Sequence, residues 1–259
     1  MLRDPQQVLQ DVYGFDSFIG PQRQIIDRIM SGQDALVIMP TGGGKSLCYQ
    51  VPSVCMEGLG VIVSPLIALM EDQVQALKQN GVRAAYLNST VAPEQSRQIH
   101  HQLFNGGLDL LYVAPERLLM DHFLGMLGRL DIALFAIDEA HCVSEWGPNF
   151  RPDYHRLKVL HERFPQVPRI ALTATADPHT RRDMLHQLRM QDADVTITTF
   201  DRPNIHFRVE PKSRAKEKLV EFITSEHDGQ AGIVYCMTRK STEHTAEYLS
   251  RRGINALPY

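Results

Sequence analysis

The sequence has few cysteines, and none of them pairs with another at a metal-binding spacing. Four cysteines are scattered along the 259 residues, and none belongs to a CxxC motif. They are Cys48, Cys55, Cys142 and Cys236. Because zinc sites and redox motifs require closely spaced cysteines, we expect reduced structural thiols and no zinc site within this chain.

The sequence also lacks long apolar runs and a strong net charge. No stretch approaches the ~20 apolar residues that cross a membrane, and the start, MLRDPQQVLQ, lacks the apolar core of a secretion signal. We therefore expect a cytoplasmic protein with no membrane partner. The formal net charge is only −3, whereas nucleic-acid-binding domains are often strongly basic. Any binding of nucleic acid therefore requires local basic patches.

What the sequence does contain is an alternation of short apolar runs with longer polar segments of helical period. The apolar runs are 35–39, 60–64, 84–88, 110–114, 133–138 and 169–174. This alternation predicts an α/β fold in which helices cover both faces of a parallel sheet. One helix start is marked especially clearly, by Asp177 as the N-cap residue and Pro178 in the first turn.

A second unit is predicted after residue 200. The segment FDRPNIHF (200–207) carries a proline and turn-forming residues. A new strand at 232–236, a helix from Arg239 and an extended end at 254–259 are expected to follow. We predict one lobe at 1–200 and a linker with the start of a second lobe at 201–259. The second part has too few elements to bury a core of its own.

The segment MPTGGGKSLCYQ (39–50) has the composition of a phosphate-binding loop, or P-loop. Such a loop needs backbone N–H groups at a helix N-terminus, glycines that let the backbone approach, a lysine for the terminal phosphates and a hydroxyl for Mg²⁺. The segment supplies Gly42, Gly43, Gly44, Lys45 and Ser46. A flexible joint is the alternative, but a joint seldom separates a buried strand from an apolar helix start. Met39 stands where the motif usually begins with glycine.

A second motif, LFAIDEAHC, places Asp138, Glu139 and His141 at the carboxyl end of an apolar strand. Ligands of open α/β sheets bind at this edge. Asp138 would hold Mg²⁺ through water, and Glu139 would orient and deprotonate the water that attacks the γ-phosphate. An ordinary acidic turn is the alternative, but the P-loop upstream favours the catalytic interpretation.

Together these motifs resemble the RecQ family of DNA helicases, in superfamily two. The strings GPQRQII, MPTGGGKSLCYQVP, VIVSPLIALMEDQV, LLYVAPERL, IDEAHCVSEWGPNFRPDY, ALTATA, FDRPNI and GIVYC occur in the order and with the spacing of that family, over nearly the whole chain. The resemblance implies a RecA-like P-loop NTPase lobe followed by an incomplete second RecA-like lobe.

The resemblance also implies an activity. It predicts an ATP-dependent DNA helicase that unwinds in the 3′–5′ direction in DNA repair and recombination, with ATP and Mg²⁺ as cofactors. Its partners would be single-stranded and partially duplex DNA. We expect a monomer in the bacterial cytoplasm or nucleoid.

Further residue roles follow from the resemblance alone. Gln22 is similar to the residue that reads the adenine edge, with Phe15 or Phe18 nearby; without the family it would pass as a surface glutamine. Thr41 is similar to a nucleotide-binding residue of the P-loop. Thr173 and Thr175, with His141, are similar to the group that relays the ATP state to lobe movement; a strand-end turn is the alternative for the threonines.

The segment SEWGPNFRPDYHR (144–156) is predicted to be an aromatic loop. Trp146, Phe150 and Tyr154 recur at helical spacing, but a glycine and two prolines between them exclude a continuous helix. Exposed aromatic rings stack on unpaired bases for ~1–3 kcal/mol each, and Arg151 and Arg156 could add phosphate or cation–π contacts. The alternative is that Trp146 pins the loop to the core. In RecQ proteins this loop senses single-stranded DNA and couples it to ATP hydrolysis.

The chain departs from the family in this loop and in its first motif. Glu145, Pro148 and Asn149 replace the usual glutamine, histidine and aspartate, which puts the strength of DNA coupling in doubt. Ile19 replaces a usual arginine ahead of Gln22.

The family pattern places the second-lobe arginines that contact the γ-phosphate beyond Tyr259, so we expect this chain to bind ATP but to hydrolyse it slowly. Two alternatives stay open: an RNA-directed DEAH-type enzyme, and a non-catalytic nucleotide- or DNA-binding fragment.

Overall fold

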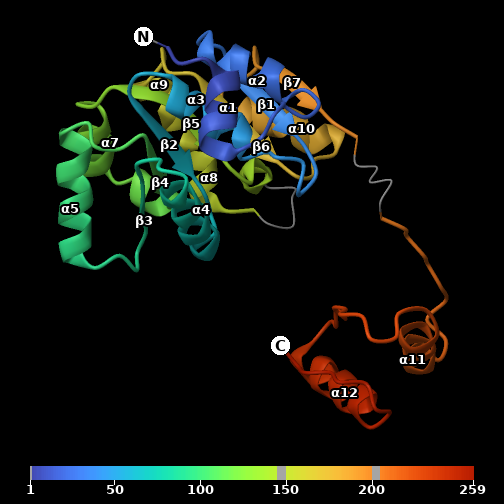
Figure 1. Cartoon of the computed structure of the whole chain (residues 1–259). Coiled ribbons are helices and arrows are strands. Elements are labelled where there is room, and N and C mark those ends of the chain that lie inside the picture. The colour runs from blue at the N-terminus through green and yellow to red at the C-terminus, as the bar shows by residue number, and fades with distance from the viewer. Residues whose placement is uncertain (1, 145–149, 200–204) are drawn as a thin grey trace. The chain divides into compact units, whose positions relative to one another are not determined.

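The computed structural model describes residues 2–144, 150–199 and 205–259. The chain divides into two compact units, Met1–Asp201 and Arg202–Tyr259 (Figure 1). The assignment of the second unit to a helicase lobe stays a prediction. Within the described ranges, no helix is long and apolar enough to span a bilayer.

The first unit is built on a sheet of seven parallel strands in the order β3-β4-β2-β5-β6-β1-β7. The strands are β1 (Ala35–Ile38), β2 (Leu59–Val63), β3 (Ala84–Leu87), β4 (Leu110–Val113), β5 (Ile132–Ile137), β6 (Arg169–Thr173) and β7 (Asp194–Ile197). The first six coincide with the six predicted apolar runs, and the predicted α/β fold is confirmed. The edge strand β7 was not predicted, although its residues Val195, Thr196 and Ile197 have the β-branched side chains that favour strands.

Ten α-helices accompany these strands in the described part of the first unit (Figure 1). They are α1 (Pro5–Tyr13), α2 (Gln22–Met30), α3 (Leu47–Cys55), α4 (Ile67–Gln79), α5 (Pro93–Phe104), α6 (Pro115–Leu118), α7 (Asp121–Leu127), α8 (Pro152–His155), α9 (Val159–Arg163) and α10 (Pro178–Gln187). Asp177 caps α10 by accepting hydrogen bonds from the backbone N–H groups of His179 and Thr180, which confirms the predicted helix start.

Alternating residues of the strands β1 to β6 pack into two separate apolar cores. Val61 and Val63 of β2 pack into the core that α5, α7 and α10 cover, whereas Ile62 packs into the core that α2, α3 and α4 cover. Side chains of a strand point alternately to the two faces of its sheet. Because helices cover both faces, β1, β2 and β4 are buried along their whole length and read as unbroken apolar runs.

One buried charge fixes the beginnings of two neighbouring strands. The Arg169 side chain is 4% exposed and pairs with Asp34, the residue before β1. It also donates hydrogen bonds to the carbonyl oxygens of Leu188 (2.7 Å) and Arg189 (3.0 Å), just after α10. A buried guanidinium needs such partners because burying an unpaired charge is costly. The contact anchors β1 and β6, the two strands that lead to the P-loop and to Thr173.

The second unit contains α11 (Ala215–Glu226) and α12 (Arg239–Ser250). The expected helix from Arg239 is present, and Thr238 and Ser241 form a reciprocal cap at its start. The expected strand at 232–236 is wrong: these residues have no regular structure, and Ile233 and Tyr235 are 81% and 92% exposed. A strand needs a neighbour to pair its backbone groups, and the described residues of this unit provide none.

Candidate nucleotide-binding site

The predicted site residues of the first unit follow three adjacent strands. The P-loop follows β1, Asp138 follows β5, and Thr173 ends β6, which lies between them. The Met39 N–H donates to the Thr173 carbonyl oxygen over 3.1 Å, so the ends of β1 and β6 stay paired as the chain leaves the sheet. The carboxyl ends of parallel strands are where open α/β sheets bind ligands.

The P-loop has the backbone form that its glycines allow. Gly42 and Gly44 adopt φ angles of 80° and 78°, in the left-handed region that favours glycine. A Cβ atom on Gly44 would also lie 2.2 Å from Nε2 of Gln22. Helix α3 begins directly after the loop, at Leu47, so its N-terminus points into the region where a phosphate would bind.

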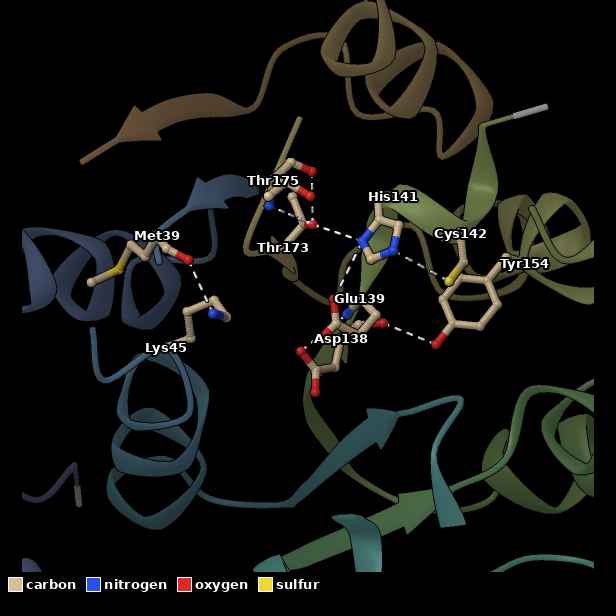
Figure 2. A network of polar contacts seen from close by, with 9 residues as sticks. All are labelled: Met39, Lys45, Asp138, Glu139, His141, Cys142, Tyr154, Thr173 and Thr175. Carbon is tan, nitrogen blue, oxygen red and sulfur yellow. Dashed lines mark hydrogen bonds and ion pairs between the residues drawn. The ribbon is translucent and has the colours of Figure 1, made fainter. Parts of the chain in front are cut away.

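Lys45 bends back over the loop. Its Nζ donates a hydrogen bond to the carbonyl oxygen of Met39 over 3.0 Å (Figure 2). The acceptor is a backbone group, so the contact does not depend on the side chain at position 39. The replacement of the usual glycine by Met39 therefore leaves this contact of the lysine intact.

Gln22 lies beneath the P-loop and is 1% exposed, so the alternative of a surface glutamine is wrong. Its Oε1 accepts from the Ile19 N–H over 2.8 Å, and its Nε2 donates to the Gly44 carbonyl oxygen over 3.2 Å. The contact uses only the backbone of Ile19, whose side chain is 73% exposed. Phe15 precedes Gln22 in the sequence, and 53% of its surface is exposed. The adenine contacts of Gln22 and of Phe15 or Phe18 stay predictions.

Asp138 and Glu139 are held by the turn that follows β5. The Asp138 N–H donates to the Val63 carbonyl oxygen over 2.9 Å, and Asp138 Oδ1 accepts from the Glu139 N–H over 3.0 Å. Glu139 has a left-handed backbone, with φ 49° and ψ 44°. Such a conformation is uncommon for a residue with a Cβ atom and often occurs at functional sites.

Tyr154 supports this turn through a hydrogen bond to its backbone. The prediction that placed Tyr154 in the aromatic loop is therefore wrong. Tyr154 lies in α8 with 0% of its surface exposed, and its hydroxyl donates to the Asp138 carbonyl oxygen over 2.9 Å (Figure 2). Pro152 opens this helix in its first turn, because a proline at that position gives up no helical hydrogen bond.

His141 links the strand ends β5 and β6. Its Nδ1 lies 2.8 Å from Thr173 Oγ1 and 3.3 Å from Glu139 Oε2, and its Nε2 lies 3.9 Å from Cys142 Sγ (Figure 2). Thr173 Oγ1 donates to the Thr175 carbonyl oxygen over 3.1 Å. Since a hydroxyl has one hydrogen, Thr173 accepts from His141 Nδ1, which must carry a proton.

The pKa values of the ionisable side chains in this turn are shifted in different directions. Burial, and next the charge of Glu139, raises the pKa of Asp138 to about 6. The hydrogen bond from His141 lowers the pKa of Glu139. The pKa of His141 is raised by its hydrogen bonds with Cys142 and with Glu139. Glu139 therefore stays ionised near neutral pH, as a base must, while Asp138 is a desolvated carboxylate suited to a cation.

The Mg²⁺ donors predicted from the sequence fit this geometry. Among the described residues, no group of three or more His, Cys, Asp and Glu side chains is arranged to hold a metal. Mg²⁺ at nucleotide sites requires less, because one or two protein oxygens, waters and phosphate oxygens complete its shell. The Ser46 hydroxyl and the buried Asp138 carboxylate are oxygen donors of this kind.

Phe150 and Arg151 lie beside the turn that follows β5. With Pro65, Leu66, Glu139, His141 and Cys142 they line a depression of about 410 Å³. Arg151 Nη1 donates to the Pro65 carbonyl oxygen over 3.1 Å, and the Arg151 N–H donates to the Cys142 carbonyl oxygen over 2.9 Å. Trp146, Glu145, Pro148 and Asn149 lie outside the described residues.

Three contacts of the site were not predicted: those of Tyr154, of Cys142 and of the Pro65 carbonyl oxygen. The contacts of Tyr154 and of the Pro65 carbonyl oxygen join residues that are distant in sequence, and that of Cys142 depends on how the turn orients two neighbouring side chains, so motif spacing carries no signal for them. For Tyr154, the proline at the start of a short helix was the available signal, because it separates α8 from the loop.

Fold and site together define a P-loop nucleotide-binding lobe with a DEAH motif. The profile of the DEAD/DEAH box helicase family matches residues 20–184. The chain belongs to the DEAD/DEAH box helicase family and, within it, is of the RecQ type.

Proteins of similar sequence support this assignment. The chain is 44% identical over 252 residues to the ATP-dependent DNA helicase RecQ of Haemophilus influenzae, covering 97% of this chain and 40% of the relative. It is 46% identical over 248 residues to the probable ATP-dependent DNA helicase RecS of Bacillus subtilis, covering 93% of this chain and 49% of the relative. The chain thus spans less than half the length of these relatives.

Solved structures agree on the fold. The DUF1998 helicase MrfA bound to DNA and AMPPNP aligns with a TM-score of 0.72 at 15% identity, over 98% of this chain and 39% of that one. A hypothetical ATP-dependent RNA helicase from Sulfolobus tokodaii aligns with a TM-score of 0.60 at 19% identity, over 94% of this chain and 71% of that one. The fold is therefore the RecA-like fold of helicases.

We predict that Asp138→Asn stabilises the chain at pH 8. A carboxyl with a raised pKa in the folded state favours folding at low pH, and this contribution is lost as pH rises from 3.8 through about 6. Asparagine keeps the oxygen that accepts from Glu139 but carries no charge. The expected gain is about 3 kcal/mol in the free energy of unfolding at pH 8, and less at pH 5.

The measurement is urea unfolding followed by circular dichroism in EDTA at both pH values. Asp72→Asn, on the exposed surface of α4, is the matched control. A loss of stability at pH 8 in Asp138→Asn, or a gain of the same size at both pH values, would contradict the buried-charge account.

Proposed function

We propose that this chain binds MgATP at the P-loop and is the nucleotide-binding part of an ATP-dependent DNA helicase of the RecQ type. The observation that carries the proposal is the convergence of Lys45, Asp138, Glu139 and Thr173 at the ends of three neighbouring strands. The names of the relatives, which are ATP-dependent DNA helicases, support the same function.

Each residue has a distinct part in the proposed reaction. Lys45 would leave the Met39 carbonyl oxygen to contact the terminal phosphates, and the backbone N–H groups of the loop and of α3 would hold the phosphate oxygens. Ser46 and Asp138 would hold Mg²⁺, which supplies positive charge at the β- and γ-phosphates. Glu139, ionised and held by His141, would orient and deprotonate the attacking water.

His141 is proposed to report the state of Glu139 to Thr173 and Thr175. Its Nδ1 is shared between Glu139 Oε2 and Thr173 Oγ1. If Glu139 takes a proton from water, its hold on Nδ1 weakens and the hydrogen bond to Thr173 is favoured. This supports the predicted coupling of ATP hydrolysis to a movement of the segment after β6.

The proposed nucleic-acid partner is single-stranded or partially duplex DNA. Phe150 and Arg151 line the depression that also contains Glu139 and His141, so a bound strand would act within reach of the catalytic turn. Trp146, five residues upstream of Arg151, is proposed as a stacking platform on sequence grounds. The alternatives are an RNA-directed enzyme and a non-catalytic binding module. The 3′–5′ direction, the roles in repair and recombination, the monomeric state and the cytoplasmic location stay predictions.

The first test separates binding from catalysis. Lys45→Ala removes the cation of the phosphate cradle and should abolish most of the affinity for MgATP. Glu139→Gln keeps the shape of the turn but removes the base, so MgATP should still bind while hydrolysis falls by ~10²–10⁴-fold. The measurements are a titration with a fluorescent ATP analogue and a phosphate-release assay, with Lys78→Ala on α4 as the matched control. Unchanged affinity in Lys45→Ala would refute the P-loop assignment, and equal loss of binding in both variants would refute separate roles.

The second test identifies the nucleic acid. Trp146→Ala should weaken binding of a single-stranded DNA oligonucleotide by about 5- to 150-fold, the equivalent of one stacked base. Phe104→Ala, which removes an aromatic ring that is 54% exposed on α5, should not change it. Binding is measured by fluorescence anisotropy with DNA and RNA of one sequence. An RNA preference would favour the RNA-directed alternative, and equal DNA affinity in both variants would exclude the stacking role.

A further inference from the structure

The peptide unit between Asp138 and Glu139 is held at both of its polar atoms. Its N–H belongs to Glu139 and donates to Asp138 Oδ1 over 3.0 Å. Its carbonyl oxygen belongs to Asp138 and accepts from the Tyr154 hydroxyl over 2.9 Å (Figure 2). A peptide unit is planar, so its N–H and C=O groups turn together. The two hydrogen bonds therefore fix the orientation of the whole unit.

The peptide unit on the other side of Glu139 is held as well. The Glu139 carbonyl oxygen accepts from the Cys142 N–H over 2.9 Å. With both flanking units held, the angles between them are fixed at φ 49° and ψ 44°. This left-handed conformation is unfavourable for a residue with a Cβ atom, and it persists only where the surrounding structure imposes it. The Tyr154 hydroxyl is one of the groups that impose it.

The segment that carries this hydroxyl is anchored at both ends of the turn. The Tyr154 N–H donates to the Arg151 carbonyl oxygen, and the Arg151 N–H donates to the Cys142 carbonyl oxygen, both over 2.9 Å. The segment thus contacts the turn at Asp138, where it begins, and at Cys142, where it ends. The hydroxyl is therefore presented by a segment that cannot shift without also disturbing the end of the turn.

The contacts of α8 with its other neighbours do not depend on the Tyr154 hydroxyl. His155 Nε2 lies 2.6 Å from Gln187 Oε1 of α10, and the Tyr154 ring packs among apolar residues such as Val143 and Leu157. Phenylalanine would fill the same space without burying a hydroxyl, a cost that only a hydrogen bond offsets. The contact that the hydroxyl adds is the one with the backbone of the turn.

The conformation of Glu139 decides where its carboxylate lies. The direction of the Cα–Cβ bond follows from the orientation of the two flanking peptide units, and Glu139 Oε2 lies 3.3 Å from His141 Nδ1. A general base has to lie within hydrogen-bonding distance of the proton that it removes, and a misplacement of about 1 Å can cost 100-fold in rate. If the peptide unit before Glu139 were free to turn, Glu139 could relax from its left-handed conformation and its carboxylate would move.

We propose that Tyr154 is a positioning residue for Glu139: its hydroxyl holds the Asp138 carbonyl oxygen and so keeps the carboxylate of Glu139 where it acts on the attacking water. The inference rests on the proposed function. The Asp138 N–H stays paired with the Val63 carbonyl oxygen, and the phosphate contacts of the proposed site come from the P-loop. Loss of the Tyr154 hydroxyl should therefore slow hydrolysis and leave the binding of MgATP unchanged.

The test uses the whole 259-residue chain. MgATP affinity is measured by titration with a fluorescent ATP analogue, and hydrolysis by phosphate release in a single turnover. Tyr154→Phe should lower the rate of phosphate release by about 10- to 100-fold at unchanged MgATP affinity, with the circular dichroism spectrum of the wild type. If Tyr154→Phe does not fold, 4-fluorophenylalanine at position 154 replaces it, because fluorine fills the place of the hydroxyl but donates no hydrogen.

Three controls separate this role from general packing. Tyr13→Phe is the matched control, because the buried Tyr13 hydroxyl has no hydrogen-bond partner among the described residues; its affinity and rate should equal those of the wild type. Substitution of 4-aminophenylalanine for Tyr154 restores an N–H donor on a ring of the same shape and should recover most of the rate. In a Glu139→Gln background, Tyr154→Phe should add no further loss, since its effect passes through Glu139.

The outcomes are distinguishable. Slower phosphate release at unchanged affinity, reversed by 4-aminophenylalanine and absent in the Glu139→Gln background, supports the inference. If Glu139→Gln slows hydrolysis but Tyr154→Phe matches the wild type, or loses MgATP affinity as much as it loses rate, the positioning role is overturned and the proposed function stands. If the wild type does not bind MgATP, or Glu139→Gln does not slow phosphate release, the proposed function itself fails, and the inference fails with it.

Discussion

The parallel pairing of β5, β6 and β1 is the constraint on which the candidate site depends. It brings segments more than a hundred residues apart to one edge of the sheet, where the Met39 N–H still pairs with Thr173 and the Asp138 N–H still pairs with Val63. The Arg169–Asp34 contact anchors the other ends of β1 and β6. The paired strand ends thereby set the positions of the P-loop and of the turn after β5 relative to each other before any ligand binds.

The site concentrates unfavourable features that the surrounding core has to support. Asp138 is a desolvated carboxylate beside a second acidic residue, Glu139 has a left-handed backbone, and the phenol hydroxyls of Tyr49 and Tyr112 lie in an apolar layer. The buried charge and the left-handed backbone each lower stability, and under the proposed function a bound cation would offset the cost of the buried charge. Such local conflicts between fold and function are expected at active sites. The Tyr154 hydroxyl shows one compensation, since it holds the strained turn through the Asp138 carbonyl oxygen.

Much of this could be predicted from the sequence, because strands buried on both faces are unbroken apolar runs and the P-loop and DEAH residues are contiguous motifs. The strand at 232–236 could not be judged in this way: an apolar run forms a strand only where a neighbour pairs with it. Tyr154 follows a helical spacing with Trp146 and Phe150 yet lies in the core, since spacing does not reveal which side of a short helix is covered. The hydrogen bonds of Tyr49 with Tyr112 join residues more than sixty positions apart, and no local pattern predicts them.

The central claim is that the segments after β1, β5 and β6 form one nucleotide site. Amide hydrogen exchange of the chain with and without a non-hydrolysable ATP analogue and Mg²⁺ tests it most directly. The account predicts slower exchange in peptides covering 40–50, 138–144 and 173–176 together, with α5 unchanged as the internal reference. Protection confined to one of these segments, or no protection at saturating nucleotide, would contradict a shared site.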